Sequence, residues 1–148
     1  MSFQTLRPQI KTLLENSGLF QQVSGTPIIN FTGYPAAYVV QSDNSNDYNT
    51  NKDNVRVYAF IVRIFYSTKS LGVDLAIQRL ETIVDSIIDL IDEDSIKSSA
   101  TRVIGVNMPN KYDWINTFAI TSSFGEVEGQ QLVTAELKIN IKVIIDIT

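Results

Sequence analysis

Apolar side chains are densest in one stretch, where a predicted strand is followed directly by a predicted helix. Val55–Tyr66 is rich in β-branched and aromatic residues and contains no proline or glycine, which favours a strand. Val73–Asp92 repeats apolar residues at spacings of three and four, which favours a helix, with Ser70 as a candidate N-cap. The apolar side of this helix comprises Ala76, Leu80, Ile83, Val84, Ile87 and Ile91.

Shorter elements are predicted on both sides of this centre. Leu6–Asn16 carries its leucines and isoleucine on one side of a helix, with Gly18 as a candidate stop. Thr5 as the N-cap would place Pro8 in the first turn, where a missing N–H costs little. The other predicted elements are a strand at Ala36–Gln41, a polar connection at Glu93–Ser99, a short strand at Arg102–Val106, a strand at Trp114–Thr121 and a loop at Ser122–Gln130.

Ser42–Asn54 has the most polar composition of any stretch. It consists of Ser, Asp, Asn, Thr and Lys around one large side chain, so it cannot bury enough surface to order itself. We expect a flexible loop that joins two antiparallel strands, and loops of this length are often functional. Asp47, Tyr48 and Lys52 are its candidate contacts with a neighbouring subunit or partner.

Leu132–Ile147 alternates apolar and polar residues over almost its whole length, which predicts a strand with one buried side. Such a strand is roughly three times longer than the usual five or six residues. Either a bulge interrupts it or its end extends onto a neighbouring subunit. The order of elements predicts an α+β domain, with two helices on one face of a mainly antiparallel sheet.

The two sides of Val55–Tyr66 differ in character. Tyr58, Phe60, Val62 and Ile64 form a bulky, uncharged side, which is the better partner for the long helix. The other side carries Arg63, and the polar side of the last predicted strand carries Glu136, Lys138 and Lys142. This mixed apolar and charged surface suits a subunit interface or the lumen of a ring better than a core.

Composition limits the chemistry that the chain can perform. Its 148 residues correspond most simply to one domain, 1–148, and no apolar run is long enough for a transmembrane helix. Cysteine and histidine are both absent, which removes thiolate nucleophiles, Cys/His metal sites and histidine acid–base catalysis. The net charge of −4 argues against nonspecific binding to nucleic acid or to acidic membranes.

Glu81, Asp85 and Asp89 form an acidic stripe along the predicted long helix. Such a stripe is most often a solvated helix face. It can also be a contact with a basic partner surface, or a pair of carboxylates for acid–base work. Like charges four residues apart are mildly unfavourable within one helix. The rest of the chain is net basic, so the alternative to a solvated face is that this stripe meets a basic face of another subunit or partner.

The order and lengths of these elements resemble the tail terminator (tail completion) proteins of tailed bacteriophages. The resemblance covers nearly the whole chain. It rests on the following segments: the helix Leu6–Asn16 followed by Leu19 and Phe20, the stretch Gly33–Val40, the polar loop, the strand Val55–Tyr66 leading into the helix Val73–Asp92, and the closing strand that ends at Ile141–Ile147.

The resemblance implies a structural virion protein rather than an enzyme. Such proteins form homohexameric rings that cap the tail tube, end its elongation and present a surface to the head–neck connector protein. In contractile tails they also contact the sheath protein. DNA passes through the ring without sequence-specific binding, and no cofactor, metal or membrane is involved. The expected location is the tail or neck of the virion, after assembly in the host cytoplasm.

Two other functions remain compatible with the sequence. One is another ring-forming neck or tail-tube protein of a phage. The other, from a different class, is a small ligand-binding α+β domain. The native mass distinguishes these classes. A tail terminator or another ring-forming phage protein requires a ring, whereas a ligand-binding domain would be a monomer with a ligand pocket.

Overall fold

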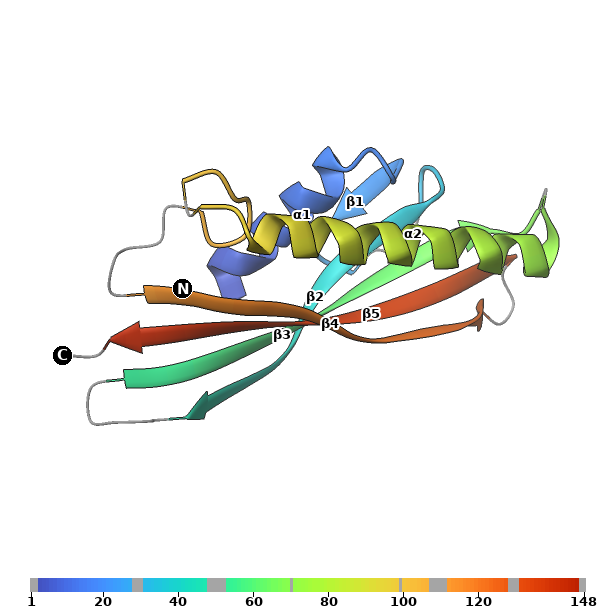
Figure 1. Ribbon diagram of the computed structural model, residues 1–148. Coiled ribbons are helices and arrows are strands. Elements are labelled where there is room, and N and C mark those ends of the chain that lie inside the picture. Colours follow the sequence, from blue (N-terminus) through green and yellow to red (C-terminus); the bar gives the residue numbers. More distant parts are fainter. Residues whose placement is uncertain are drawn as a thin grey trace.

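Five strands form a single sheet in a computed structural model that describes residues 3–27, 31–47, 53–69, 71–98, 100–106, 112–127 and 131–146. The strand order is β1-β2-β3-β5-β4; β1 is parallel to β2 and the other neighbouring pairs are antiparallel. Both helices lie on one side of the sheet, with α2 running along its length (Figure 1). This confirms the predicted α+β class. The elements are α1 (Phe3–Asn16), β1 (Gln22–Ser24), β2 (Ala36–Asp47), β3 (Asp53–Ser67), α2 (Gly72–Ser95), β4 (Tyr112–Val127) and β5 (Leu132–Asp146).

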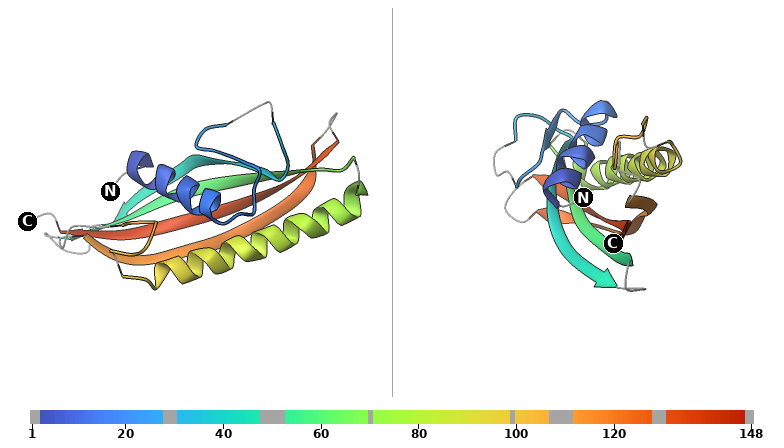
Figure 2. Two further views of the ribbon diagram at one scale, coloured as in Figure 1. Left: turned by 90° about the horizontal axis from the view of Figure 1, so that it is seen from above. Right: turned by 90° about the vertical axis from the view of Figure 1, so that its left-hand side faces the viewer.

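The hydrophobic core lies between the two helices and one face of the sheet (Figure 2). β3 contributes its bulky side as predicted, and Phe60, Val62 and Ile64 are fully buried there. β5 contributes its odd-numbered residues from Val133 to Val143, while the even-numbered ones between them are half-buried. The predicted apolar side of α2 is buried against the same face. Alternation along the strands and the helical period of α2 therefore define the same core.

β5 is paired within the chain along the whole of its described length, and no bulge interrupts its ladder with β3. β3 pairs with it continuously from Ser67↔Leu132 to Asp53↔Asp146 without a register shift. β4 pairs with its other edge, and the two register shifts on that side fall between Trp114 and Asn116 and between Ala119 and Thr121, on β4. The predicted bulge in β5 is therefore wrong, while the prediction that its end extends onto a neighbouring subunit stays a prediction. β3, β4 and β5 are simply long together.

The predicted flexible loop at Ser42–Asn54 is mostly strand. β2 continues to Asp47 after a register shift between Gln41 and Asn44, and β3 begins at Asp53. The amide Nδ2 of Asn54 donates a 3.0 Å hydrogen bond to Oδ1 of Asn46 across the hairpin. Backbone pairing extends through this polar sequence because a ladder needs no apolar side chains. The prediction that the flanking strands are antiparallel is confirmed, while Tyr48 and Lys52 lie outside the described residues.

The N-terminal helix begins earlier than predicted. It starts at Phe3, so Thr5 lies inside it and is not its cap, and Pro8 is within the helix. The ring of Phe3 packs edge-on against Tyr58 and Phe60, with centroid distances of 5.0 and 5.4 Å. This packing stabilises a turn that the sequence pattern did not include. The predicted stop is consistent with the structure, because Gly18 has φ +73°, a conformation that favours glycine.

The start of α2 also differs from the prediction. The N-cap position is occupied by Leu71, which makes no side-chain capping hydrogen bond, and Ser70 lies outside the described residues. At its other end α2 continues to Ser95, one turn into the predicted polar connection.

The segment after α2 is held by side chains, so the strand predicted at Arg102–Val106 does not form. The buried carboxylate of Asp94 accepts hydrogen bonds from the backbone amides of Val103 and Ile104, at 2.8 and 3.0 Å. Gln9 Oε1 accepts another from the amide of Gly105 at 2.8 Å. These amides are occupied by side chains and cannot join a sheet. Burial lowers the pKa of the Arg102 guanidinium, and the nearby Asp94 carboxylate opposes this shift.

β4 is longer than predicted and continues through the expected loop at Ser122–Gln130 as far as Val127. Gly125, which suggested a turn, pairs with Thr134 of β5 inside the ladder. Pairing with a long neighbouring strand outweighs the low strand propensity of glycine here.

Candidate subunit interface

The sheet face turned away from the helices carries the charged residues predicted for a subunit contact. The register places Arg63 of β3 directly opposite Glu136 of β5. Ile61 and Val57 stand opposite Lys138 and Lys142 in the same way. We call this surface, defined by Val57, Ile61, Arg63, Glu136, Lys138 and Lys142, the open face. All six residues are half-buried, and they form a mixed apolar and charged surface that neither described helix covers.

Arg63 links three strands across the open face. Its Nε donates a 2.8 Å hydrogen bond to Oε1 of Glu136, and its Nη1 donates a 3.0 Å hydrogen bond to the hydroxyl of Tyr38 on β2. The hydrogen bond with Tyr38 is the main cause that raises the pKa of the Arg63 guanidinium, and burial opposes it. The side chains of Arg63 and Glu136 are each 41% exposed. The pair therefore fixes the positions of two charges that a partner can still reach.

We expect the Arg63–Glu136 pair to contribute little to the stability of the free subunit. In a double-mutant cycle of Arg63→Ala and Glu136→Ala, the coupling free energy should be about 0.2–1 kcal/mol, as for exposed ion pairs. Urea unfolding of the four proteins measures this value. A coupling well above that range would mean that the pair is a folding element rather than a contact surface.

An aromatic cluster lies beside this ion pair. Phe31 packs against Phe65 of β3 with a centroid distance of 4.8 Å, and Tyr38 packs against the same ring at 5.7 Å. Tyr34 is 5.7 Å from Phe31. Sequence reasoning did not single out Tyr38 as a partner of Arg63. Aligning Ala36–Gln41 antiparallel to Val55–Tyr66 would have provided the signal, since Tyr38 pairs with Arg63 in the ladder.

The acidic stripe lies on the side of α2 that is turned away from the core. Glu81, Asp85 and Asp89 are all exposed, as expected for a solvated or partner-facing helix surface. The structure therefore does not bring them near Arg63, Lys138 or Lys142 of the same chain, because α2 covers the opposite face of the sheet. Among the described residues, no group of His, Cys, Asp or Glu is arranged to hold a metal ion.

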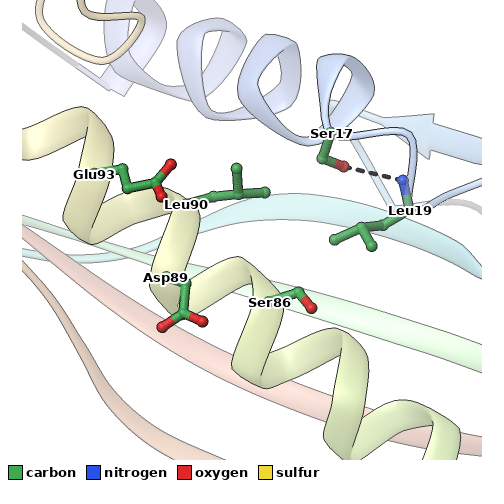
Figure 3. A pocket seen from close by; sticks show the side chains of 6 residues that line it. All are labelled: Ser17, Leu19, Ser86, Asp89, Leu90 and Glu93. Carbon is green, nitrogen blue, oxygen red and sulfur yellow. Dashed lines mark hydrogen bonds between the residues drawn. The ribbon is translucent and has the colours of Figure 1, made fainter.

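A groove of about 300 Å³ runs between the end of α1 and the last turns of α2. Figure 3 shows Leu19 and Leu90 pointing toward one another across it, with Glu93 beside Leu90. Ser17 Oγ accepts a 3.2 Å hydrogen bond from the amide of Leu19, which holds this turn in place. The remaining lining residues are Ser86 and Asp89. The groove thus has a leucine side chain on each side and carboxylates on the α2 side, and its lining includes Asp89 of the acidic stripe.

The third group of predicted contacts lies at the β2–β3 hairpin. Asp47 is the last residue of β2 and pairs with Val55, at the end of the sheet farthest from β1. Tyr48 and Lys52, as noted, lie outside the described residues. No helix of the described chain is long and apolar enough to cross a membrane.

The described residues form an α+β domain that carries both helices on one face of its sheet, and neither helix covers the other face. No protein-family model and no curated protein matches the sequence. The structure is similar to a chain in the solved virion of the native gene transfer agent (GTA) particle. The TM-score is 0.52 at 11% sequence identity, and the match covers 95% of this chain and 92% of that chain. At this identity the likeness concerns the fold.

Proposed function

We propose that this chain is a structural virion protein that acts as a tail terminator. In this role it forms a homohexameric ring that caps the tail tube, ends tail elongation and offers a joining surface to the head–neck connector protein. DNA passes through the ring, the sheath protein is a further partner in contractile tails, and no reaction is catalysed. The ring is assembled in the host cytoplasm and becomes part of the tail or neck.

The observation that carries this proposal is the fold shared with a chain of a virion particle over almost the whole length of both chains. Two features of the chain agree with it. The order of elements resembles the tail terminator family, and the open face presents half-buried apolar residues around a fixed ion pair, as a subunit contact does. A heterologous contact repeated around an axis closes into a ring.

Native mass spectrometry and negative-stain imaging test the proposal, with the protein alone and with tail tubes present. We expect sixfold rings, either free in solution or at the tube end. Rings that bind the tube along its length or enter the tube wall would instead indicate a tube or neck protein. Monomers or twofold dimers under every condition would contradict a ring-forming role.

Arg63→Glu should leave a folded subunit that assembles poorly. The change places two carboxylates opposite one another on the open face, which costs the single chain about 1 kcal/mol, while it reverses a charge at the proposed contact. Lys97→Glu is the matched control, because Lys97 is exposed after α2 and the charge change is the same. Circular dichroism reports the fold and native mass the assembly. Equal assembly of both variants would remove Arg63 from the interface.

A further inference from the structure

The groove between the two helices lies where both of them end. It is lined by the turn that follows α1 and by the last turns of α2. Leu19 and Leu90 point toward one another from these two sides, and both are half-buried, so part of each side chain remains accessible (Figure 3). Its volume of about 300 Å³ is at the lower end of ligand-binding sites. The groove therefore has room for a short piece of chain rather than for a large ligand.

The charged groups that line the groove are the carboxylates of Asp89 and Glu93. Both side chains are exposed, and neither forms an ion pair with another described residue. Lys97 follows Glu93 by four residues and is also exposed, but the two are not paired. The groove thus presents two accessible negative charges that no described cation neutralises by contact.

The ends of the two helices add to this negative potential. The C-terminal end of a helix carries a partial negative charge equivalent to about half an elementary charge, which a nearby cation stabilises. Neither α1 nor α2 has a basic residue in its last turn. The helix ends and the two carboxylates therefore favour a cation in the groove, and the two leucines favour an apolar group beside that cation.

We propose that this groove binds a segment of a partner protein in which an apolar side chain is flanked by lysine or arginine. The apolar side chain lies between Leu19 and Leu90, and the flanking cations pair with Asp89 and Glu93. Such a segment offers apolar surface and positive charge together, which is the combination that the groove lacks within its own chain. The contact uses the helix side of the subunit and does not depend on the proposed ring.

Titration of the ¹⁵N-labelled full chain with blocked pentapeptides, followed by amide chemical shifts, tests the proposal. The sequence Lys-Ser-Leu-Ser-Lys places its three larger side chains on one side of an extended chain and should shift the amides of Leu19 and Leu90. Replacing its leucine with serine, or both lysines with glutamine, should each raise the dissociation constant at least about tenfold. Low salt is used, since salt screens contacts between exposed charges.

Two double variants show which carboxylates bind the peptide. Asp89→Asn with Glu93→Gln keeps the shape of both side chains and removes their charges, so the dissociation constant should rise at least about tenfold. Glu81→Gln with Asp85→Asn is the matched control, because it changes the net charge equally on the same helix but outside the groove lining. Its dissociation constant should stay within about twofold of the native value. Circular dichroism checks that both variants are folded.

The other outcomes overturn the proposed contact. Equal weakening by the two double variants would mean that the peptide responds to the overall charge of α2 and not to the groove. Equal binding with and without leucine, or shifts confined to amides away from Leu19 and Leu90, would show a nonspecific effect of positive charge. Absence of binding by the lysine peptide would overturn it as well. None of these results bears on the ring, whose presence native mass determines separately.

Discussion

Phe60→Ala should lower the free energy of unfolding by about 3–5 kcal/mol, the usual cost of truncating a buried aromatic residue. Phe60 is fully buried at the centre of β3, and Phe3 of α1 packs against its ring at 5.4 Å. The substitution therefore leaves a cavity where α1 meets the sheet. Urea unfolding followed by circular dichroism measures the loss, and the variant is expected to be poorly soluble.

Phe65→Ala is the matched control for this prediction. Phe65 lies on the same strand but on the other face, where it is half-buried against Phe31 and Tyr38. Its truncation removes less buried surface and should cost clearly less than that of Phe60. A larger loss at Phe65 than at Phe60, or an unfolded Arg63→Glu variant beside a stable Phe60→Ala variant, would show that the two faces of β3 are assigned the wrong way round.

Asp94→Ala should cost about 2–4 kcal/mol, because one side chain satisfies two backbone amides in a buried site. Asp94 is 2% exposed, and its two carboxylate oxygens accept from Val103 and Ile104 separately. Without them the amides of half-buried Val103 and buried Ile104 both lose their acceptor, and the buried Arg102 loses its neighbouring negative charge. Thermal unfolding measures the loss, and amide hydrogen exchange should show faster exchange at these two residues.

Two variants at the same helix end show whether this loss comes from the hydrogen bonds. Asp94→Asn retains only one acceptor oxygen, so its stability should fall between those of the native chain and Asp94→Ala. Asp92→Ala removes an exposed carboxylate from the same turn and should change stability by no more than about 0.5 kcal/mol. Equal losses at Asp92 and Asp94 would mean that charge near the helix end matters and the amide hydrogen bonds do not.

The parts of the fold that are periodic in sequence could be predicted. The apolar side of α2 and the alternation of β5 each repeat often enough to define a buried side, and the structure confirms both. The placement of Arg63 and Glu136 on the same side of the sheet followed from the same alternation, while their direct pairing came from the strand register. Periodicity determines which side of an element is buried.

Other parts could not be predicted because their structure depends on distant residues. Ser42–Asp47 and Ser122–Val127 are strands only because β3 and β5 offer a backbone edge to pair with, and neither has an apolar pattern of its own. Arg102–Val106 has the residues of a strand, but its backbone amides donate hydrogen bonds to the side chains of Asp94 and Gln9 instead of to a neighbouring strand. For the candidate interface, the charged residues could be named from the sequence alone, while the part played by Tyr38 required the strand order.

The central position of β5 has a consequence for the folding of the subunit. β3 pairs with β5 between residues that are 65 to 93 positions apart, since Ser67 meets Leu132 and Asp53 meets Asp146. Contacts at such separation slow folding, because the conformational entropy lost on closing the long loop between them opposes their formation. Until β5 has been synthesised, β3 lacks its neighbour on that edge, and the open face lacks Glu136, Lys138 and Lys142. A nascent chain therefore cannot present Arg63 paired with Glu136, so synthesis through β5 must precede any association through this surface.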